Sequence, residues 1–219
     1  MKKKTMEEKV HVTCDKCKKY GFEFRSKHNV SPADFIDGNV NADIWIIGLN
    51  PKNKIGHIEE RSLSDFKSFN PNGHPYFKNF KKVSERLYKN WEREDRNIAH
   101  TDLVKCFSET FPPTNGKKGV SNAKQIIDNC VDFLKIQILT HQPKMIICNS
   151  SAVCWEMIRL FPPQQDVDFS SLTSYCTNID NHDFWIVLSG FIGRIDNRNK
   201  RRLGMEIEQI IEKENIKIE

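Results

Sequence analysis

Short apolar runs alternate along the chain with longer segments in which apolar residues recur at helical spacing. The least interrupted run, 44–49, predicts a strand that is buried on both faces, as in a parallel sheet. Similar runs predict further strands at 98–104, 144–148 and 184–188. Helical spacing predicts helices at 76–91, 121–139, 150–160 and 198–214.

Strands that alternate with helices predict a parallel sheet with helices on both faces. We therefore expect an α/β fold, a three-layer α/β/α sandwich with a central four-stranded, mainly parallel sheet. The 219 residues suffice for one such domain, which we expect to span 1–219. Residues 1–9 are charged and expected to be flexible, and 10–40 form an N-terminal segment before the first strand.

The residues at the ends of the first, second and fourth predicted strands could carry chemistry. Asn50 and Pro51 end the first strand, and the proline keeps Asn50 out of the helical region. Cys106 follows the second strand and Ser189 the fourth. Ligands bind to open α/β sheets at the carboxyl ends of strands, so these positions are candidates for a site. Asn-Pro is also common in turns, and a plain strand-end turn is the alternative.

The charge balance favours a polyanionic partner. The chain carries 34 Lys and Arg against 29 Asp and Glu, a net charge of +5, which suits a polyanion. No apolar run approaches the roughly 20 residues that cross a membrane. The basic residues 1–4 are not followed by the apolar segment of a signal peptide. We expect no membrane association, a cytoplasmic location and a monomer.

The seven cysteines fall into two groups. In a reducing compartment they are expected to be ligands or buried apolar residues rather than disulfides. Cys14 and Cys17 form a Cys-x-x-Cys pair, whose thiolates can reach one metal centre. A redox pair is the alternative, although the strand–helix context of a thioredoxin motif is missing. No ligand spacing is evident at Cys148, Cys154 and Cys176, which we expect to be structural.

Four segments, in order and spacing, resemble the uracil-DNA glycosylase superfamily. They are the strand and turn at 43–51, Gly-His-Pro-Tyr at 73–76, Thr-Asp-Leu-Val-Lys-Cys at 101–106, and Leu-Ser-Gly at 188–190 with the basic residues after it. The third is similar to the motif of the iron–sulfur branch, which usually reads Thr-Asn-Val-Val-Lys-Cys. The resemblance covers about residues 10–212 and implies the fold predicted above.

The resemblance to the iron–sulfur branch also implies a cofactor. Its cluster-binding pattern matches Cys14, Cys17, Cys106 and Cys130, with a longer stretch than usual between the last two. Four thiolates are what a [4Fe–4S] cluster requires. A structural zinc is the alternative, because four cysteines also bind Zn²⁺. In either case the metal centre ties segment 10–40 to the rest of the domain.

The resemblance further implies an activity: a monofunctional DNA glycosylase flips out a pyrimidine and hydrolyses its N-glycosidic bond, leaving an abasic site. Asn50 stands where the superfamily keeps a water-positioning Asp or Asn, with Gly48 and Leu49 beside the base. Tyr76 would stack on the base, or Phe77 if the register is shifted by one. No lysine suited to Schiff-base lyase chemistry is evident.

Asp102 departs from the family pattern, which has Asn at this position. An ionised carboxylate only accepts hydrogen bonds, so it suits the N4 amino group of cytosine better than O4 of uracil. We therefore favour a modified cytosine as the target, including a hypermodified phage base excised in antiviral defence. A protonated Asp102 could instead donate to O4 of uracil. An Asp that only braces a loop is the third possibility.

Ser189 is the second departure, because the family has His here as donor to the departing base. Serine is smaller and a weaker donor, which fits either a wider pocket or weak or lost catalysis. The histidines His57, His74 and His100 are possible replacements, and each could equally be an ordinary histidine.

A basic cluster follows the last motif. It consists of Arg194, Arg198, Lys200, Arg201 and Arg202. We expect these residues to meet DNA phosphates, aided by the amino terminus of the last helix, and a solvated helix face is the alternative. Three functions stay open: excision of a modified cytosine, uracil excision in base excision repair, and DNA binding without catalysis.

Overall fold

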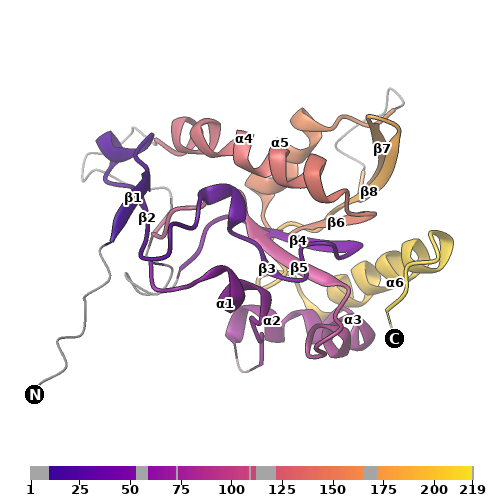
Figure 1. Cartoon of the computed structure of the whole chain (residues 1–219). Coiled ribbons are helices and arrows are strands. Elements are labelled where there is room, and N and C mark those ends of the chain that lie inside the picture. Colours follow the sequence, from indigo (N-terminus) through magenta and orange to yellow (C-terminus); the bar gives the residue numbers. More distant parts are fainter. Residues whose placement is uncertain are drawn as a thin grey trace, which may run out of the picture.

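Figure 1 shows the computed structural model of the chain, which describes residues 10–52, 59–72, 74–108, 110–111, 122–164 and 172–218. The expectation of flexibility at residues 1–9 and the expected helix start at Ser121 lie outside these ranges. So do Gly73 and His57.

A six-stranded sheet forms the middle layer, in the order β3-β5-β4-β6-β8-β7. The strands are β3 (Asp37–Gly38), β4 (Ile44–Gly48), β5 (Ile98–Asp102), β6 (Met145–Cys148), β7 (Ser174–Ile179) and β8 (His182–Leu188). The four central strands are mutually parallel, and β3 and β7 pair antiparallel at the two edges. The expected α/β sandwich with its four parallel strands is confirmed, and the sheet has two more strands than expected.

Helices cover both faces of this sheet (Figure 1). One face carries α4 (Ala123–His141) and α5 (Ser151–Leu160). The other face carries α2 (Pro75–Lys78), α3 (Glu85–Trp91) and α6 (Asn197–Lys213), while α1 (Leu63–Lys67) lies beside β3. No helix in the part of the chain that the structure describes is long and apolar enough to cross a membrane.

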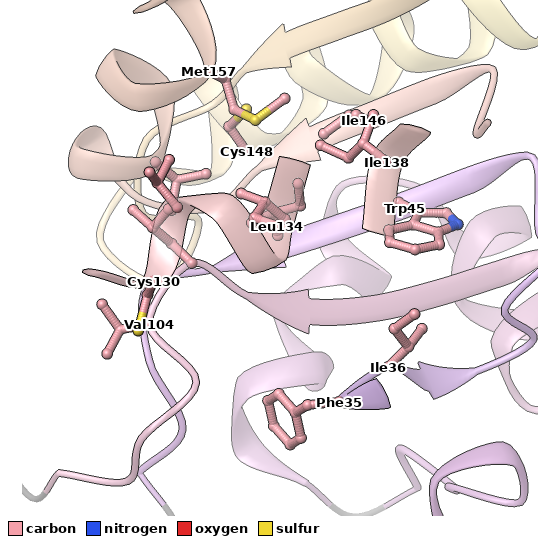
Figure 2. Close-up of a cluster of buried hydrophobic side chains, with 14 of the residues drawn as sticks. Phe35, Ile36, Trp45, Val104, Cys130, Leu134, Ile138, Ile146, Cys148 and Met157 are labelled. Carbon is pink, nitrogen blue, oxygen red and sulfur yellow. The ribbon is translucent and has the colours of Figure 1, made fainter. Parts of the chain in front are cut away.

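Alternation along β4 divides the core into two layers. Trp45 and Ile47 belong to the cluster under α4, where Figure 2 shows Trp45 beside Ile138 and Ile146. Ile44 and Ile46 belong to the cluster under α2, α3 and α6. All four side chains are inaccessible to solvent, as expected for a strand buried on both faces.

The single helix expected over 76–91 is wrong. The chain forms α2, then a 3-10 turn at Phe80–Lys82, then α3. Ser84 breaks the helix because its backbone is extended and its hydroxyl accepts a hydrogen bond from the Leu87 N–H at 3.0 Å. The Val83 carbonyl then meets Gly204 of α6, where any Cβ would collide with it. The break therefore lets α6 pack closely against this segment.

The N-terminal segment forms a hairpin outside the main sheet. β1 (His11–Cys14) and β2 (Phe24–Ser26) pair antiparallel, with a 3-10 turn at Lys18–Tyr20 between them. A second 3-10 turn, Pro32–Asp34, leads into β3. The hairpin lies beside the amino-terminal half of α4 (Figure 1), where Asn129 donates to the Lys16 carbonyl at 3.2 Å.

Candidate active site

The carboxyl ends of the parallel strands bring the predicted polar residues to one edge of the sheet. Gly48 pairs directly with Asp102, and the strand-end residue Cys148 pairs with Leu188, just before Ser189. The pairing of β4 and β5 continues past their ends, because Leu103 N–H donates to the Gly48 carbonyl at 2.9 Å. The loops that follow these two neighbouring strands are thereby held close together.

Gly48 leaves space for three functional groups. A Cβ at this position would collide with Asp102 Oδ1 and would lie 3.0 Å from the Tyr76 hydroxyl and 3.2 Å from His100 Nε2. These three side chains therefore converge on the volume that any larger residue at position 48 would fill. We call Gly48, Tyr76, His100 and Asp102 the glycine cradle.

Asp102 is buried in the cradle, and burial raises the pKa of its carboxyl to about 6. The nearby Asp37 raises it further, whereas His100 and Lys105 oppose the shift. The carboxyl therefore changes its charge close to neutral pH. Above about pH 6 it is an acceptor only, and below that it carries a proton that it can donate.

The two aromatic candidates have different environments. Phe77 is 3% exposed and packs in the core against Trp91, with ring centroids 4.6 Å apart. Tyr76 is half-buried, and its hydroxyl is buried without a hydrogen-bond partner among the described residues. Burial, and then Asp102, raise the pKa of Tyr76, so the phenol stays protonated. Tyr76 is thus the aromatic residue that faces the site.

The amide of Asn50 is oriented by the loop after β5. Its Nδ2 donates to the carbonyls of Pro51 at 3.2 Å and Ser108 at 3.3 Å. Because only the NH₂ group can donate, these two bonds fix which end of the amide is which. Its Oδ1 is buried and has no hydrogen-bond partner among the described residues. Asn50 therefore presents an open acceptor, while the Leu49 side chain packs into the core under α4.

Asn149 is a site residue that the sequence reasoning missed. It follows β6, is 2% exposed, and accepts a hydrogen bond from the Ile192 N–H at 2.7 Å. Asn149 lies close enough to the Tyr76 hydroxyl to oppose the rise in its pKa, although no aligned hydrogen bond joins them. A polar residue directly after the strand predicted at 144–148 was the available signal.

Ser189 is engaged with the backbone. Its hydroxyl donates to the Cys148 carbonyl at 2.7 Å, and the Gly190 carbonyl lies 3.1 Å away. Together with Asn149 it shapes the loop that follows β8. In this arrangement the hydroxyl proton of Ser189 is directed at protein oxygen rather than toward a ligand.

A family model of the uracil DNA glycosylase superfamily matches residues 35–189, from the residues before β3 to the end of β8. The chain belongs to the uracil DNA glycosylase superfamily. Members of this superfamily are DNA glycosylases, hydrolases that act on DNA. No curated protein matches the chain.

The glycine cradle contains one of the three histidines considered as replacements at the Ser189 position. His100 lines the cradle through its Nε2 atom. His74 packs beside Tyr76 and Phe77, with ring centroids 6.4 and 5.3 Å away.

The four candidate ligand cysteines come together where the hairpin, β5 and α4 meet. Cys17, Cys106 and Cys130 are buried and Cys14 is half-buried. The Cys130 thiol contacts Cys17, which lowers the pKa of Cys17 to about 6, with further help from Asn129. Burial raises the pKa of Cys106 to about 12, and the fields of Cys17 and Cys14 add to this rise. Within the described ranges, no three His, Cys, Asp or Glu side chains are arranged to hold a single metal ion.

The residues of the basic cluster after β8 differ in their contacts. Lys200 is buried and its Nζ donates to Asn79 Oδ1 at 3.2 Å, which ties α6 to the end of α2. Asp196 accepts hydrogen bonds from the N–H groups of Arg198 and Asn199, so the amino terminus of α6 is already capped. This capping occupies two of the N–H groups at that helix terminus, whose expected help in phosphate binding stays a prediction.

Phe191 is a surface residue that the sequence reasoning missed. It lies in the loop after β8, is 41% exposed, and has the Arg194 guanidinium 5.8 Å from its ring centroid. Arg194, Arg198 and Arg201 are exposed around it along the same loop and the first turns of α6. An aromatic residue directly after the last motif was the available signal.

The geometry of the glycine cradle predicts that Gly48→Ala destabilises the protein. The added methyl group would displace Asp102, and overpacking of this kind lowers the free energy of unfolding by about 1–3 kcal/mol. Urea denaturation measures the loss. Repeating the change in an Asp102→Ala background removes the colliding carboxylate, so the cost of Gly48→Ala should shrink there. Equal costs in both backgrounds would contradict the cradle geometry.

Asp102→Asn should change how stability depends on pH. A carboxyl pKa raised from 3.8 to about 6 makes the folded state bind a proton more tightly, so its contribution to stability is lost as pH rises through about 6. The free energy of unfolding of Asp102→Asn relative to wild type should therefore rise by about 1 kcal/mol between pH 5 and 7.5. Asp183→Asn, at an exposed position, is the matched control. Parallel pH curves for wild type and Asp102→Asn would contradict the shift.

Proposed function

We propose that the protein is a monofunctional DNA glycosylase that flips out a modified cytosine and hydrolyses its N-glycosidic bond. The observation that carries the proposal is the buried Asp102 carboxylate opposite Gly48, in a cradle at the strand ends of a superfamily member where we expect a base to bind. Above about pH 6 this carboxylate accepts hydrogen bonds, and the N4 amino group of a cytosine-type base supplies one.

The reaction needs a leaving group and a nucleophile. The C1′–N1 bond breaks with its electron pair passing to the base, and a water oxygen bonds to C1′. Asn50 Oδ1, the open buried acceptor, supports a role in orienting that water through one of its O–H groups. An amide is a poor proton acceptor, so stabilisation of the departing base must supply much of the rate. The protonated Tyr76 phenol is the neutral donor nearest to Asp102 in the cradle.

Uracil excision is the second candidate, and the raised pKa of Asp102 favours it below about pH 6. A protonated Asp102 donates to O4 of uracil, as the family Asn would. The engagement of the Ser189 hydroxyl with backbone carbonyls favours weak catalysis, and DNA binding without catalysis is the limiting case.

The surface beside the cradle supports DNA as the partner. Phe191 is an exposed apolar side chain that could fill the gap left by a flipped base. Arg194, Arg198 and Arg201 provide positive charge for the phosphates on either side. Lys200 is held by Asn79 and acts by placing α6 rather than by meeting phosphate.

For the cofactor we propose a [4Fe–4S] cluster held by the four cysteines. The donor set fits, because the thiols of Cys17 and Cys130 are in contact and the fields of Cys14 and Cys17 reach Cys106. A cluster takes one thiolate on each of its four irons, so it requires four thiols gathered in one place. The cluster would fasten the β1–β2 hairpin to α4 and the loop after β5. A structural zinc is the alternative.

A panel of oligonucleotides tests the proposed function. Each carries cytosine, a modified cytosine or uracil, and alkali converts abasic sites to strand breaks. Excision of the N4-bearing base should increase as pH rises through about 6, because the carboxylate form is the acceptor. Asp102→Asn should move preference toward uracil, and Asn50→Ala should lower excision of every base by about 10²-fold or more.

Two outcomes of the panel would contradict the proposal. Cleavage of uracil alone would support the second candidate and remove the argument from Asp102. Absence of cleavage of any base would leave a DNA-binding protein. Asp183→Asn, an exposed carboxylate change on β8, is the matched control and should leave the preference unchanged.

Metal analysis of the purified protein tests the cofactor. We expect about four irons and four sulfides per chain, with the brown colour of such clusters. Cys130→Ser should lose the colour and most of the iron, whereas Cys176→Ser, on β7, should keep both. One zinc per chain and no colour would support the alternative, and absence of both metals would contradict a metal centre.

A further inference from the structure

Three buried titratable side chains lie in a row on two neighbouring strands. Asp37 of β3 pairs directly with His100 of β5, and Asp102 follows His100 on the same face of β5. Their exposed fractions are 5, 6 and 4%. Elsewhere on this face of the sheet, apolar residues such as Ile46 of β4 pack against α3 and against α2, which contributes Phe77. Unpaired charge in such a layer costs several kcal/mol, so the row requires an explanation.

A carboxylate lies on each side of the imidazole, and an arginine lies beyond one of them. The Arg61 guanidinium forms an ion pair with Asp37 Oδ1 and lies 3.9 Å from the Phe66 ring centroid. Asp37 Oδ2 is 3.5 Å from His100 Nδ1, and Asp102 Oδ1 is 3.9 Å from His100 Nε2. Neither ring nitrogen has a hydrogen-bond partner among the described residues. A small movement on ligand binding would turn both approaches into hydrogen bonds.

Aromatic neighbours set the plane of the imidazole. The His100 ring meets Phe77 edge-on at 5.2 Å and Tyr76 at 5.4 Å, with Trp91 at 6.3 Å. These contacts leave the two nitrogens facing the two carboxylates. Nε2 also lines the cradle, so the row ends where the proposed function places the base.

We propose that His100, held by Asp37, is a positioning residue that fixes the charge and direction of Asp102 and thereby selects the base edge. The proposal rests on the proposed function. The imidazole opposes the burial that raises the pKa of the Asp102 carboxyl, and so favours its ionised, accepting form. Without the imidazole, Asp102 would hold its proton to higher pH and donate instead. The row thus discriminates an amino group from a carbonyl on the base.

Other charged or titratable groups face the row and bear on its pH dependence. Arg61 approaches Asp37 from the segment before α1, and Tyr76 and His74 approach from the start of α2. Lys105 acts on Asp102 from the loop after β5. Because none of these is changed by a substitution at His100, a shift seen in that variant reports on the imidazole.

The first test measures kcat/KM for the N4-bearing base and for uracil across pH. His100 lowers the pKa of Asp102, so in His100→Phe the midpoint of the pH profile should move up by about one unit and the preference for the N4-bearing base should fall by about tenfold at neutral pH. His100→Gln, which keeps a hydrogen-bonding side chain without a charge, should recover kcat but not the midpoint. An unchanged profile and preference in His100→Phe would overturn the proposal.

The second test needs no activity, so it separates failure of this inference from failure of the proposed function. Carboxyl ¹³C NMR of the full chain follows the titration of Asp102, identified by the signal lost in Asp102→Asn. His100→Gln should raise its midpoint by about one unit, since the imidazole lowers the pKa of this carboxyl. Asp196, whose carboxylate caps α6, is the internal control. An unmoved Asp102 midpoint in His100→Gln would overturn the proposal even if no base were cleaved.

Discussion

The lack of a side chain at Gly48 is the constraint on which the site depends. β4 and β5 are paired in register, so residue 48 lies directly opposite Asp102, and any Cβ would occupy the position of its carboxylate. The empty position lets a carboxylate, a phenol and an imidazole from two different elements share one small volume. Glycine at the end of this fully buried strand therefore makes room for the functional groups of the site, in addition to its effect on the backbone conformation.

Polar groups are also buried on both faces of β5 and just after its end. On the α4 side, Lys105 is inaccessible to solvent, and its Nζ donates to Thr101 Oγ1 at 2.6 Å and Gln137 Oε1 at 2.7 Å. Burial lowers the pKa of Lys105 to about 7. On the other side lie His100 and Asp102. Burying so many titratable groups on one strand makes the free energy of folding less favourable. Such groups are typical of strands that carry a functional site.

The sequence predicted the parts of the fold that follow from local pattern. β4, β6 and the second part of β8 are apolar runs, and the order of the strands and helices along the chain predicted the layers. β7 was missed because Ser174, Thr177 and Asn178 hide its alternation, and β3 because two residues give no period. The helix break at Ser84 depends on packing against Gly204, 120 residues away, which no local pattern reveals.

The candidate site was predictable in its strand-end residues and not in their neighbours. Asn50 and Ser189 stood out because each follows a predicted strand, and Gly48 and Asp102 because each belongs to a motif that resembles the superfamily. His100 was only one of three histidines, since its importance comes from lying beside Asp37 across a strand pairing that the sequence did not predict. Ser189 donates a hydrogen bond to a backbone carbonyl, and Lys200 donates one to Asn79. Both are tertiary contacts, which no local sequence pattern reveals.

A crystal structure with DNA tests the central claim most directly. The duplex would carry a modified cytosine whose 2′-fluorinated sugar resists hydrolysis. The account predicts a flipped base above Gly48, with its N4 amino group within hydrogen-bond distance of Asp102 Oδ1 and a water held by Asn50 Oδ1 beneath the sugar. A base bound elsewhere on the protein, or one whose N4 edge faces away from Asp102, would contradict it.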